Sequence, residues 1–169
     1  MSKVLNIEIE KAVRLLAEHL PVSNKNSKKP ILAHDIRVGR YLYKHNYSQD
    51  IILAGILHDA LEFSDASEQK LKDEFGKNVV NVIKACTKNK TIEDDDERID
   101  ELALRCSREG KDALIVRAAD ILDSFKYYTK GNNPAELEYC RKNAEAIFKY
   151  LPGGFEDKIF DELRKWYKK

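Results

Sequence analysis

Residues 48–63 read SQDIILAGILHDALEF, an almost wholly apolar stretch with a histidine and an aspartate side by side near its centre. Ser48 is a favoured residue type at a helix N-cap, and the acid at Asp50 suits the first turn of a helix. We therefore predict one buried helix over residues 48–63. His58 and Asp59 are then polar side chains in a core, and they need partners there.

Apolar residues recur at helical spacing along the rest of the chain, which contains only 4 prolines and 7 glycines. The β-branched stretch 78–87 lacks the alternation of a half-buried strand, so we predict a buried helix there as well. We expect an all-α protein, a single compact helical bundle that forms one domain over residues 1–169. The predicted helices cover residues 9–20, 31–45, 48–63, 68–75, 78–87, 96–109, 111–128, 135–151 and a last segment that ends near Trp166.

The composition excludes several classes of function. The net charge is +1, so the overall field of the protein offers no attraction for a nucleic-acid partner. No apolar run approaches the roughly 20 residues of a membrane span. The first 20 residues carry acids at helical spacing, unlike a secretory leader, and the 3 cysteines form no CxxC pair. We expect a cytoplasmic protein; its oligomeric state is left open.

Four polar residues fall on apolar helix faces: His34, His58, Asp59 and Asp120. An ionised carboxylate that is buried alone costs several kcal/mol or more, so each aspartate needs a cation or hydrogen-bond donors. Two imidazoles and two carboxylates would form a mixed nitrogen–oxygen shell, which suits Mn²⁺, Fe²⁺ or Zn²⁺.

Structural alternatives exist for each of these residues. A single histidine in a core is usually held by hydrogen bonds alone, and Asp59 has possible ion-pair partners in Arg37 and Arg117. Spacing by itself therefore leaves a metal site and a set of satisfied core residues both open.

The order of the motifs favours the metal site. PILAH at 30–34, LHDALEF at 57–63, FGKNVVNVIKACTK at 75–88 and VRAADILDSF at 116–125 follow one another along the chain. This succession resembles the HD superfamily of metal-dependent phosphohydrolases. It is most similar to the hydrolase domain of the RelA/SpoT homologues, which include the stand-alone small alarmone hydrolases. The resemblance covers roughly residues 5–130.

The resemblance implies metal ligands at His34, His58, Asp59 and Asp120. It further implies a divalent metal, Mn²⁺ foremost with Fe²⁺ or Zn²⁺ as alternatives, and hydrolysis of the 3′-pyrophosphate of guanosine tetra- or pentaphosphate. Glu62 shares a helix face with His58 and Asp59, and it is our candidate catalytic residue, orienting water or moving a proton. The alternative for Glu62 is a solvated residue at a helix end.

The same resemblance assigns substrate contacts to the basic loop before His34 and to the position four residues after Asp120. Lysines there can hold phosphates, although the residues differ from the usual Arg-Lys-Ser run. At the second position the family usually carries an amide that contacts the nucleotide. The candidate substrate-binding residues are Lys25, Asn26, Ser27, Lys28 and Ser124.

Phe63 stands where the alarmone hydrolases usually carry a second catalytic acid beside the glutamate. Three functions therefore stay open. The first is a nucleotide phosphohydrolase of the HD type that resembles guanosine-3′,5′-bis(diphosphate) 3′-pyrophosphohydrolase. The second is an HD-type nucleoside monophosphate phosphatase. The third is a domain that binds metal and nucleotide without turnover.

Overall fold

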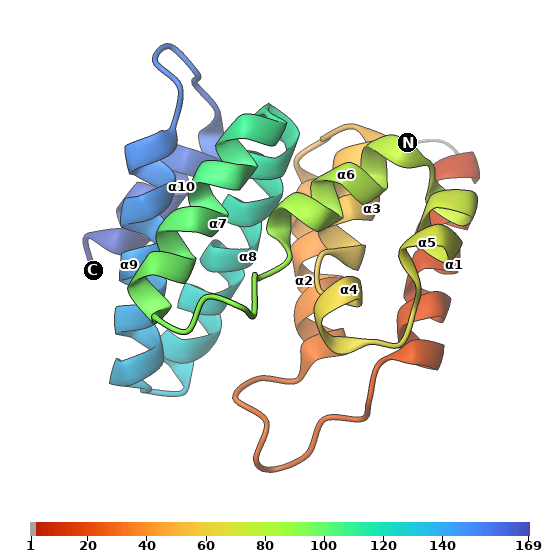
Figure 1. Cartoon of the computed structure of the whole chain (residues 1–169), viewed down its shortest axis with the longest axis horizontal. Helices are drawn as coiled ribbons and strands as arrows, with labels where there is room; N and C mark the ends of the chain where they lie inside the picture. The colour runs from red at the N-terminus through yellow and green to blue at the C-terminus, as the bar shows by residue number, and fades with distance from the viewer. Residues whose placement is uncertain (1–2) are drawn as a thin grey trace.

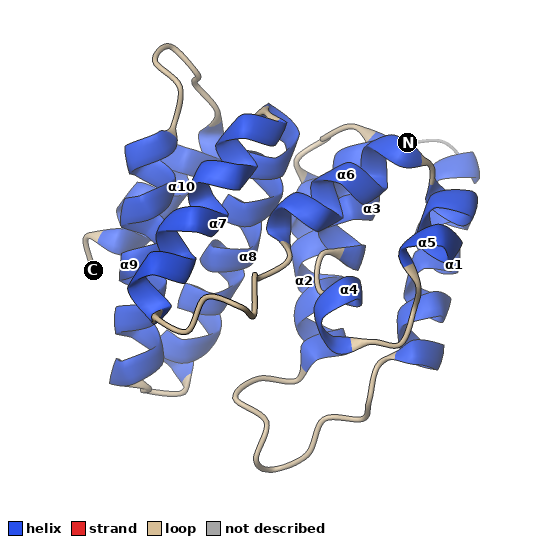
Figure 2. Cartoon of the chain, viewed as in Figure 1, coloured by secondary structure: helices blue, strands red, loops and turns tan. Residues whose placement is uncertain are grey.

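A computed structural model describes residues 3–169 and shows a bundle of helices joined by short loops (Figures 1 and 2). Within these residues there is no strand, which confirms the predicted all-α class. None of the described helices combines the length and apolarity needed to cross a membrane. The helices are α1 Lys3–His19, α2 Ile31–Lys44, α3 Gln49–Leu57, α4 Ala60–Phe63, α5 Glu68–Phe75, α6 Lys77–Cys86, α7 Asp95–Glu109, α8 Lys111–Lys130, α9 Pro134–Tyr150 and α10 Lys158–Tyr167.

Helix α8 is the centre of the bundle. It packs against α2, α3 and α6 on one side and against α7, α9 and α10 on the other, as Figure 1 shows. Every residue of α8 from Ala113 to Leu122 is buried. The main apolar core runs from Leu5 in α1 to Leu163 in α10, and a smaller cluster of Ile99, Ala103 and Ala146 lies between α7 and α9. Asp120 therefore lies deep inside the protein, where α8 faces α2. The extent of one domain over 1–169 stays a prediction.

Two glycines hold α2 and α3 in close contact. A Cβ atom on Gly39 would lie 2.2 Å from Cγ1 of Ile56, and one on Gly55 would lie 2.2 Å from Cδ1 of Leu42. Because each helix presents a glycine to a branched side chain of the other, their backbones approach closely. This contact fixes the start of α2 beside the end of α3.

The single helix predicted over 48–63 is wrong at its centre. Ser48 does cap the first helix, since its side chain accepts a hydrogen bond from the Ile51 amide, but α3 ends at Leu57 and α4 begins at Ala60. His58 Nδ1 lies 2.9 Å from the Gly55 carbonyl oxygen, the acceptor that the amide of a helical residue 59 would use. The histidine side chain thus competes with the helix, and the chain turns at the His58–Asp59 pair.

Candidate metal centre

The four predicted metal ligands come together from three parts of the chain. His34 lies in the first turn of α2, His58 and Asp59 lie in the turn between α3 and α4, and Asp120 lies in α8. Oδ1 of Asp120 is 3.0 Å from Nε2 of His34 and 3.8 Å from Nε2 of His58. Oδ1 of Asp59 is 3.6 Å from the same His58 nitrogen. Two imidazole nitrogens and two carboxylates therefore face one point.

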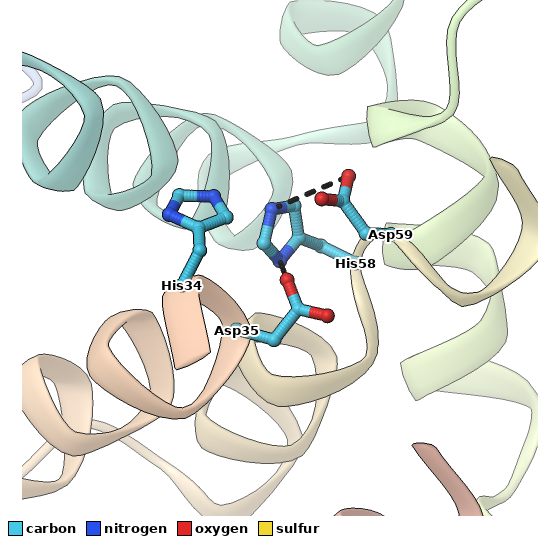
Figure 3. Close-up of side chains that lie close together, drawn as sticks. All are labelled: His34, Asp35, His58 and Asp59. Carbon is cyan, nitrogen blue, oxygen red and sulfur yellow. Dashed lines mark ion pairs between the residues drawn. The ribbon is translucent and has the colours of Figure 1, made fainter. Parts of the chain in front are cut away.

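The ring of His58 is oriented by its own backbone. Nδ1 is held at the Gly55 carbonyl, while the buried Nε2 has no hydrogen-bond partner among the described residues and faces Asp59 and Asp120. Figure 3 shows Asp59 at the Nε2 end of this ring and Asp35 at the Nδ1 end. Although burial alone lowers the pKa of His58, the carboxylates of Asp59, Asp120 and Asp35 raise it to about 10. The surroundings of this nitrogen thus favour positive charge.

The ring of His34 is oriented by a carboxylate. Nδ1 of His34 lies 2.7 Å from Oδ2 of Asp123, and the guanidinium of Arg37 binds both oxygens of Asp123. Burial raises the pKa of Asp123, but the hydrogen bonds from His34 and Arg37 outweigh it and lower the pKa. An ionised Asp123 keeps the proton on Nδ1 and turns Nε2 of His34 toward Asp120. Metal-binding histidines are commonly held by a carboxylate in this way.

Asp120 is held by a buried arginine. Arg117, one turn earlier in α8, donates to Oδ2 of Asp120 and to the side-chain oxygen of Asn143 in α9. Burial raises the pKa of Asp120, but Lys29 and Arg117 hold it well below its usual range. The aspartate is therefore ionised.

The structural alternative for Asp59 is not what the protein shows. The two arginines that the sequence offered to it bind other aspartates: Arg37 binds Asp123 and Arg117 binds Asp120. Asp59 instead lies 14% exposed beside His58. Its carboxylate is thus free to serve as a ligand.

Asp35 is a fifth polar residue of the centre, and the sequence reasoning missed it. One atom each of His34, Asp35, His58 and Asp59 can be chosen so that all lie within 4.8 Å of one another. Asp35 is completely buried, and neither oxygen has a hydrogen-bond partner in the part of the chain that the structure describes. Burial raises the pKa of Asp35 to about 8. The signal was present in the sequence, because His34-Asp35 repeats the His58-Asp59 pair.

The buried carboxylate of Asp35 bears on whether these residues fit a metal ion. A carboxylate that is buried without donors is costly, and a nearby divalent cation offsets that cost. The donor set of imidazole nitrogens and carboxylate oxygens is one that binds Mn²⁺, Fe²⁺ or Zn²⁺. The cluster therefore fits a divalent metal, and its chemistry does not select one of the three.

A cavity of about 380 Å³ lies beside the ligands. Asp59, Asp120 and Glu62 line it, whereas His34 and His58 are buried and do not. Glu62 is not the solvated helix-end residue that was the alternative: its side chain is only 6% exposed. Lys88, in the loop after α6, places its ammonium 3.1 Å from Oε1 of Glu62 and its backbone amide 3.4 Å from Oε2. No sequence signal connects these two residues, which are brought together by the fold.

The predicted substrate-binding residues divide into three groups. Ser27 and Lys28 line the cavity, and the ammonium of Lys28 forms an ion pair with Glu136 of α9. Lys25 and Asn26 are exposed on the same loop and do not line the cavity. Ser124 is buried and accepts a hydrogen bond from Lys29. Ser124 thus contacts the ligand cluster rather than the open space.

Phe63 lies at the edge of the cavity and is 36% exposed. The ammonium groups of Lys88 and Lys90 lie 5.7 Å and 5.9 Å from the centre of its ring. This distance is within the range of a cation–π contact. The side of the cavity that carries Glu62 is therefore basic and aromatic.

Comparison with known proteins identifies the family of this chain. The sequence profile of the HD domain family matches residues 12–152, which is most of the chain. The chain belongs to the HD domain family. The matched range contains His34, His58, Asp59 and Asp120.

Curated relatives of this HD domain are much longer proteins. It is 27% identical over 124 residues to a putative chloroplastic GTP diphosphokinase of rice, and 24% identical over 121 residues to a guanosine-3′,5′-bis(diphosphate) 3′-pyrophosphohydrolase of Aquifex aeolicus. These alignments cover 72% and 70% of this chain. The chain spans only 13% and 17% of the two relatives' own lengths.

Two solved structures share the fold of this HD domain over nearly their whole length. One is described as a metazoan ortholog of SpoT that hydrolyses ppGpp; it has a TM-score of 0.73 and 18% identity, and the match covers 99% of this chain and 96% of that one. The other, from Listeria monocytogenes, has a TM-score of 0.68 and 19% identity, with 88% and 97% covered. At these identities the likeness establishes the fold alone.

Proposed function

We propose that this HD domain is a metal-dependent phosphohydrolase that acts on a nucleotide, with guanosine 3′-pyrophosphates as the leading substrate class. One observation carries the proposal: His34, His58, Asp59 and Asp120 come together beside a cavity that is lined by Asp59, Asp120, Glu62 and several lysines. The names of the curated relatives, which include guanosine-3′,5′-bis(diphosphate) 3′-pyrophosphohydrolases, support the choice of substrate.

The metal would be held by His34 and His58 through Nε2 and by the carboxylates of Asp59 and Asp120. When bound, a divalent ion lowers the pKa of water and offsets charge on a phosphoryl oxygen. Mn²⁺ is the proposed ion, and Fe²⁺ and Zn²⁺ suit the same donors. Asp123 orients the ring of His34 through its Nδ1, and Asp35 lies 3.6 Å from Nδ1 of His58, where its negative charge favours a cation at the cluster.

Glu62 is the proposed catalytic residue. Its carboxylate lines the cavity next to Asp59, where it can accept a proton from an attacking water or hold that water in line with the phosphorus. Lys88 contacts both oxygens of Glu62, through its ammonium and its backbone amide, and so fixes the direction of the carboxylate. A base is therefore in place, and Lys88 positions it.

The cationic side chains on the cavity wall would hold the phosphates of the substrate. Lys28 and Lys88 line the cavity from opposite loops, and Arg98 of α7 lies on the same wall. An anion with several phosphates can contact all three, whereas a neutral ligand gains nothing from them. This arrangement favours a polyphosphate over a neutral ester.

The test is a phosphate-release screen on the metal-loaded protein. Guanosine tetraphosphate, guanosine pentaphosphate, guanosine triphosphate and the nucleoside monophosphates would each be incubated with Mn²⁺, and pyrophosphate and phosphate would be measured separately. We expect pyrophosphate from the guanosine 3′-pyrophosphates. Release of phosphate from monophosphates alone would replace the proposal with the phosphatase.

The nucleoside monophosphate phosphatase is the second candidate, and the position of Phe63 favours it. The ring occupies space at the edge of the cavity, next to Glu62, and it can neither accept a proton nor hold water. The variant Phe63→Asp separates the two enzymes: a gain in pyrophosphate release from guanosine tetraphosphate supports the pyrophosphohydrolase, while activity confined to monophosphates in both forms supports the phosphatase. Metal and nucleotide binding without any turnover would identify the non-catalytic domain.

A further inference from the structure

Lys29 lies inside the ligand cluster, although it comes from the loop before α2. Its ammonium is 2.8 Å from Nε2 of His34, 2.8 Å from Oγ of Ser124 and 3.5 Å from Oδ1 of Asp120. Its side chain is 17% exposed, far less than that of its neighbour Lys28 at 76%. The ammonium thus sits where ligand atoms of α2 and α8 converge.

The ammonium and a metal ion need the same atom. With Nδ1–H of His34 donating to Asp123, Nε2 carries a lone pair, and the ammonium of Lys29 donates to that lone pair. A metal bound by His34 would use this lone pair too. The two cations therefore exclude each other at Nε2, and both are attracted by the carboxylate of Asp120.

We propose that Lys29 is an exchangeable cation that closes the ligand cluster and must leave it before a metal can bind. This inference rests on the proposed metal centre and adds a residue that sets its affinity.

The cavity provides space for the side chain of Lys29 once it leaves the ligand cluster. Lys29 lines the cavity of about 380 Å³ together with Lys28, and its backbone belongs to a loop rather than to a helix. A rotation of the long, flexible side chain is enough to move the ammonium from His34 into this space. There it faces the region that we assign to the substrate phosphates.

A Mn²⁺ titration of the metal-stripped protein tests the exchange. Wild type, Lys29→Met and Lys28→Met would be compared by calorimetry, because methionine keeps the length of lysine and removes its charge. Lys29→Met should bind Mn²⁺ about tenfold more tightly, since the metal no longer has to break a charge-assisted hydrogen bond. Lys28→Met should match wild type, since Lys28 lies on the same loop and makes no contact with His34.

The outcomes separate this inference from the proposed function. Equal or weaker Mn²⁺ binding in Lys29→Met, with clear binding in wild type, would overturn the exchange and leave the metal centre intact. If none of the three proteins binds Mn²⁺, the metal centre and the exchange both fail.

A second measurement needs no variant and covers the case in which Lys29→Met does not fold. Wild-type lysines would be acetylated with an amine-reactive ester, and each site would be quantified by mass spectrometry with and without Mn²⁺. Displacement exposes the ammonium of Lys29, so its labelling should increase several-fold relative to that of exposed Lys25. Unchanged labelling of Lys29 at saturating Mn²⁺ would overturn the exchange.

Discussion

The floor of the cavity and its rim are built in different ways. By the floor we mean the ligand cluster of His34, Asp35, His58, Asp59 and Asp120, of which Asp59 and Asp120 line the cavity; these residues are buried or nearly so and belong to helices or to the turn between two of them. By the rim we mean other residues that line the cavity, namely Ser27, Lys28, Glu62, Phe63 and Lys88. Helix packing fixes the floor, whereas the rim is set by loops and by the short α4. The comparison indicates that helix packing sets the candidate metal ligands, whereas loops and the short α4 set the residues proposed to select the substrate.

The largest expected effect comes from breaking the floor. His58→Ala removes the nitrogen that faces Asp59 and Asp120, so the metal content should fall from about one ion per chain to almost none. Metal-dependent thermal stabilisation, about 2.7 kcal/mol at a hundredfold excess over the dissociation constant, should disappear with it. Elemental analysis and melting curves with and without Mn²⁺ measure both effects.

The matched control for this prediction is His45→Ala. His45 lies at the end of α2, where its ring packs against Tyr41, outside the ligand cluster. It should keep the full metal content. If His58→Ala also keeps it, the assignment of the floor as a metal centre is wrong.

The next largest effect belongs to the rim and should leave the metal in place. Glu62→Gln keeps the shape of the side chain and its contacts to Lys88 but removes the base. We expect kcat to fall by about 10²- to 10⁴-fold with unchanged metal content. Glu68→Gln, on the exposed surface of α5, is the control and should have wild-type kcat. A kcat for Glu62→Gln within about twofold of wild type would remove Glu62 from the mechanism.

The sequence predicted the floor better than the rim, and the reason lies in how each residue is fixed. His34, His58, Asp59 and Asp120 each interrupt an apolar helix face, so hydrophobic periodicity alone marks them. Their convergence follows from helix packing, which the order of the motifs also indicated. The break at His58 was missed because a hydrogen bond between a side chain and a backbone carbonyl oxygen does not alter the hydrophobic periodicity of the sequence.

The missed contacts join lysines in loops to side chains on helices that are distant in the sequence. Lys88 reaches Glu62 across 26 positions of the chain, and Lys29 reaches Ser124 across 95. Nothing in the local pattern of a lysine in a polar loop says which acid it will meet. The same reasoning placed Lys25 and Asn26 in the site, while the structure leaves them exposed away from the cavity.

A smaller effect is expected from the charges of the rim. The change Lys28→Ala should raise KM about tenfold and change kcat much less, because this lysine attracts the bound substrate and the transition state alike. The difference from wild type should shrink as salt is added. Lys44→Ala, an exposed lysine at the end of α2, is the control. An unaltered KM at low salt would show that the loop is only a connector.

The smallest expected effect concerns Asp35 and the pH dependence of the stability of the metal-free protein. The pKa of Asp35 is raised to about 8 in the folded state from 3.8, so between these values the folded protein holds a proton that the unfolded chain has lost. Stability must therefore fall as the pH rises through this window. Asp35→Asn removes the titration, and it should raise the melting temperature of the metal-free protein by at least about 3 °C at pH 8 and by much less at pH 5.

The same variant should bind Mn²⁺ about tenfold more weakly, because His58 loses a carboxylate on its Nδ1 side. Lower stability of Asp35→Asn at pH 8 would mean that Asp35 is satisfied within the fold and that its burial does not depend on a metal.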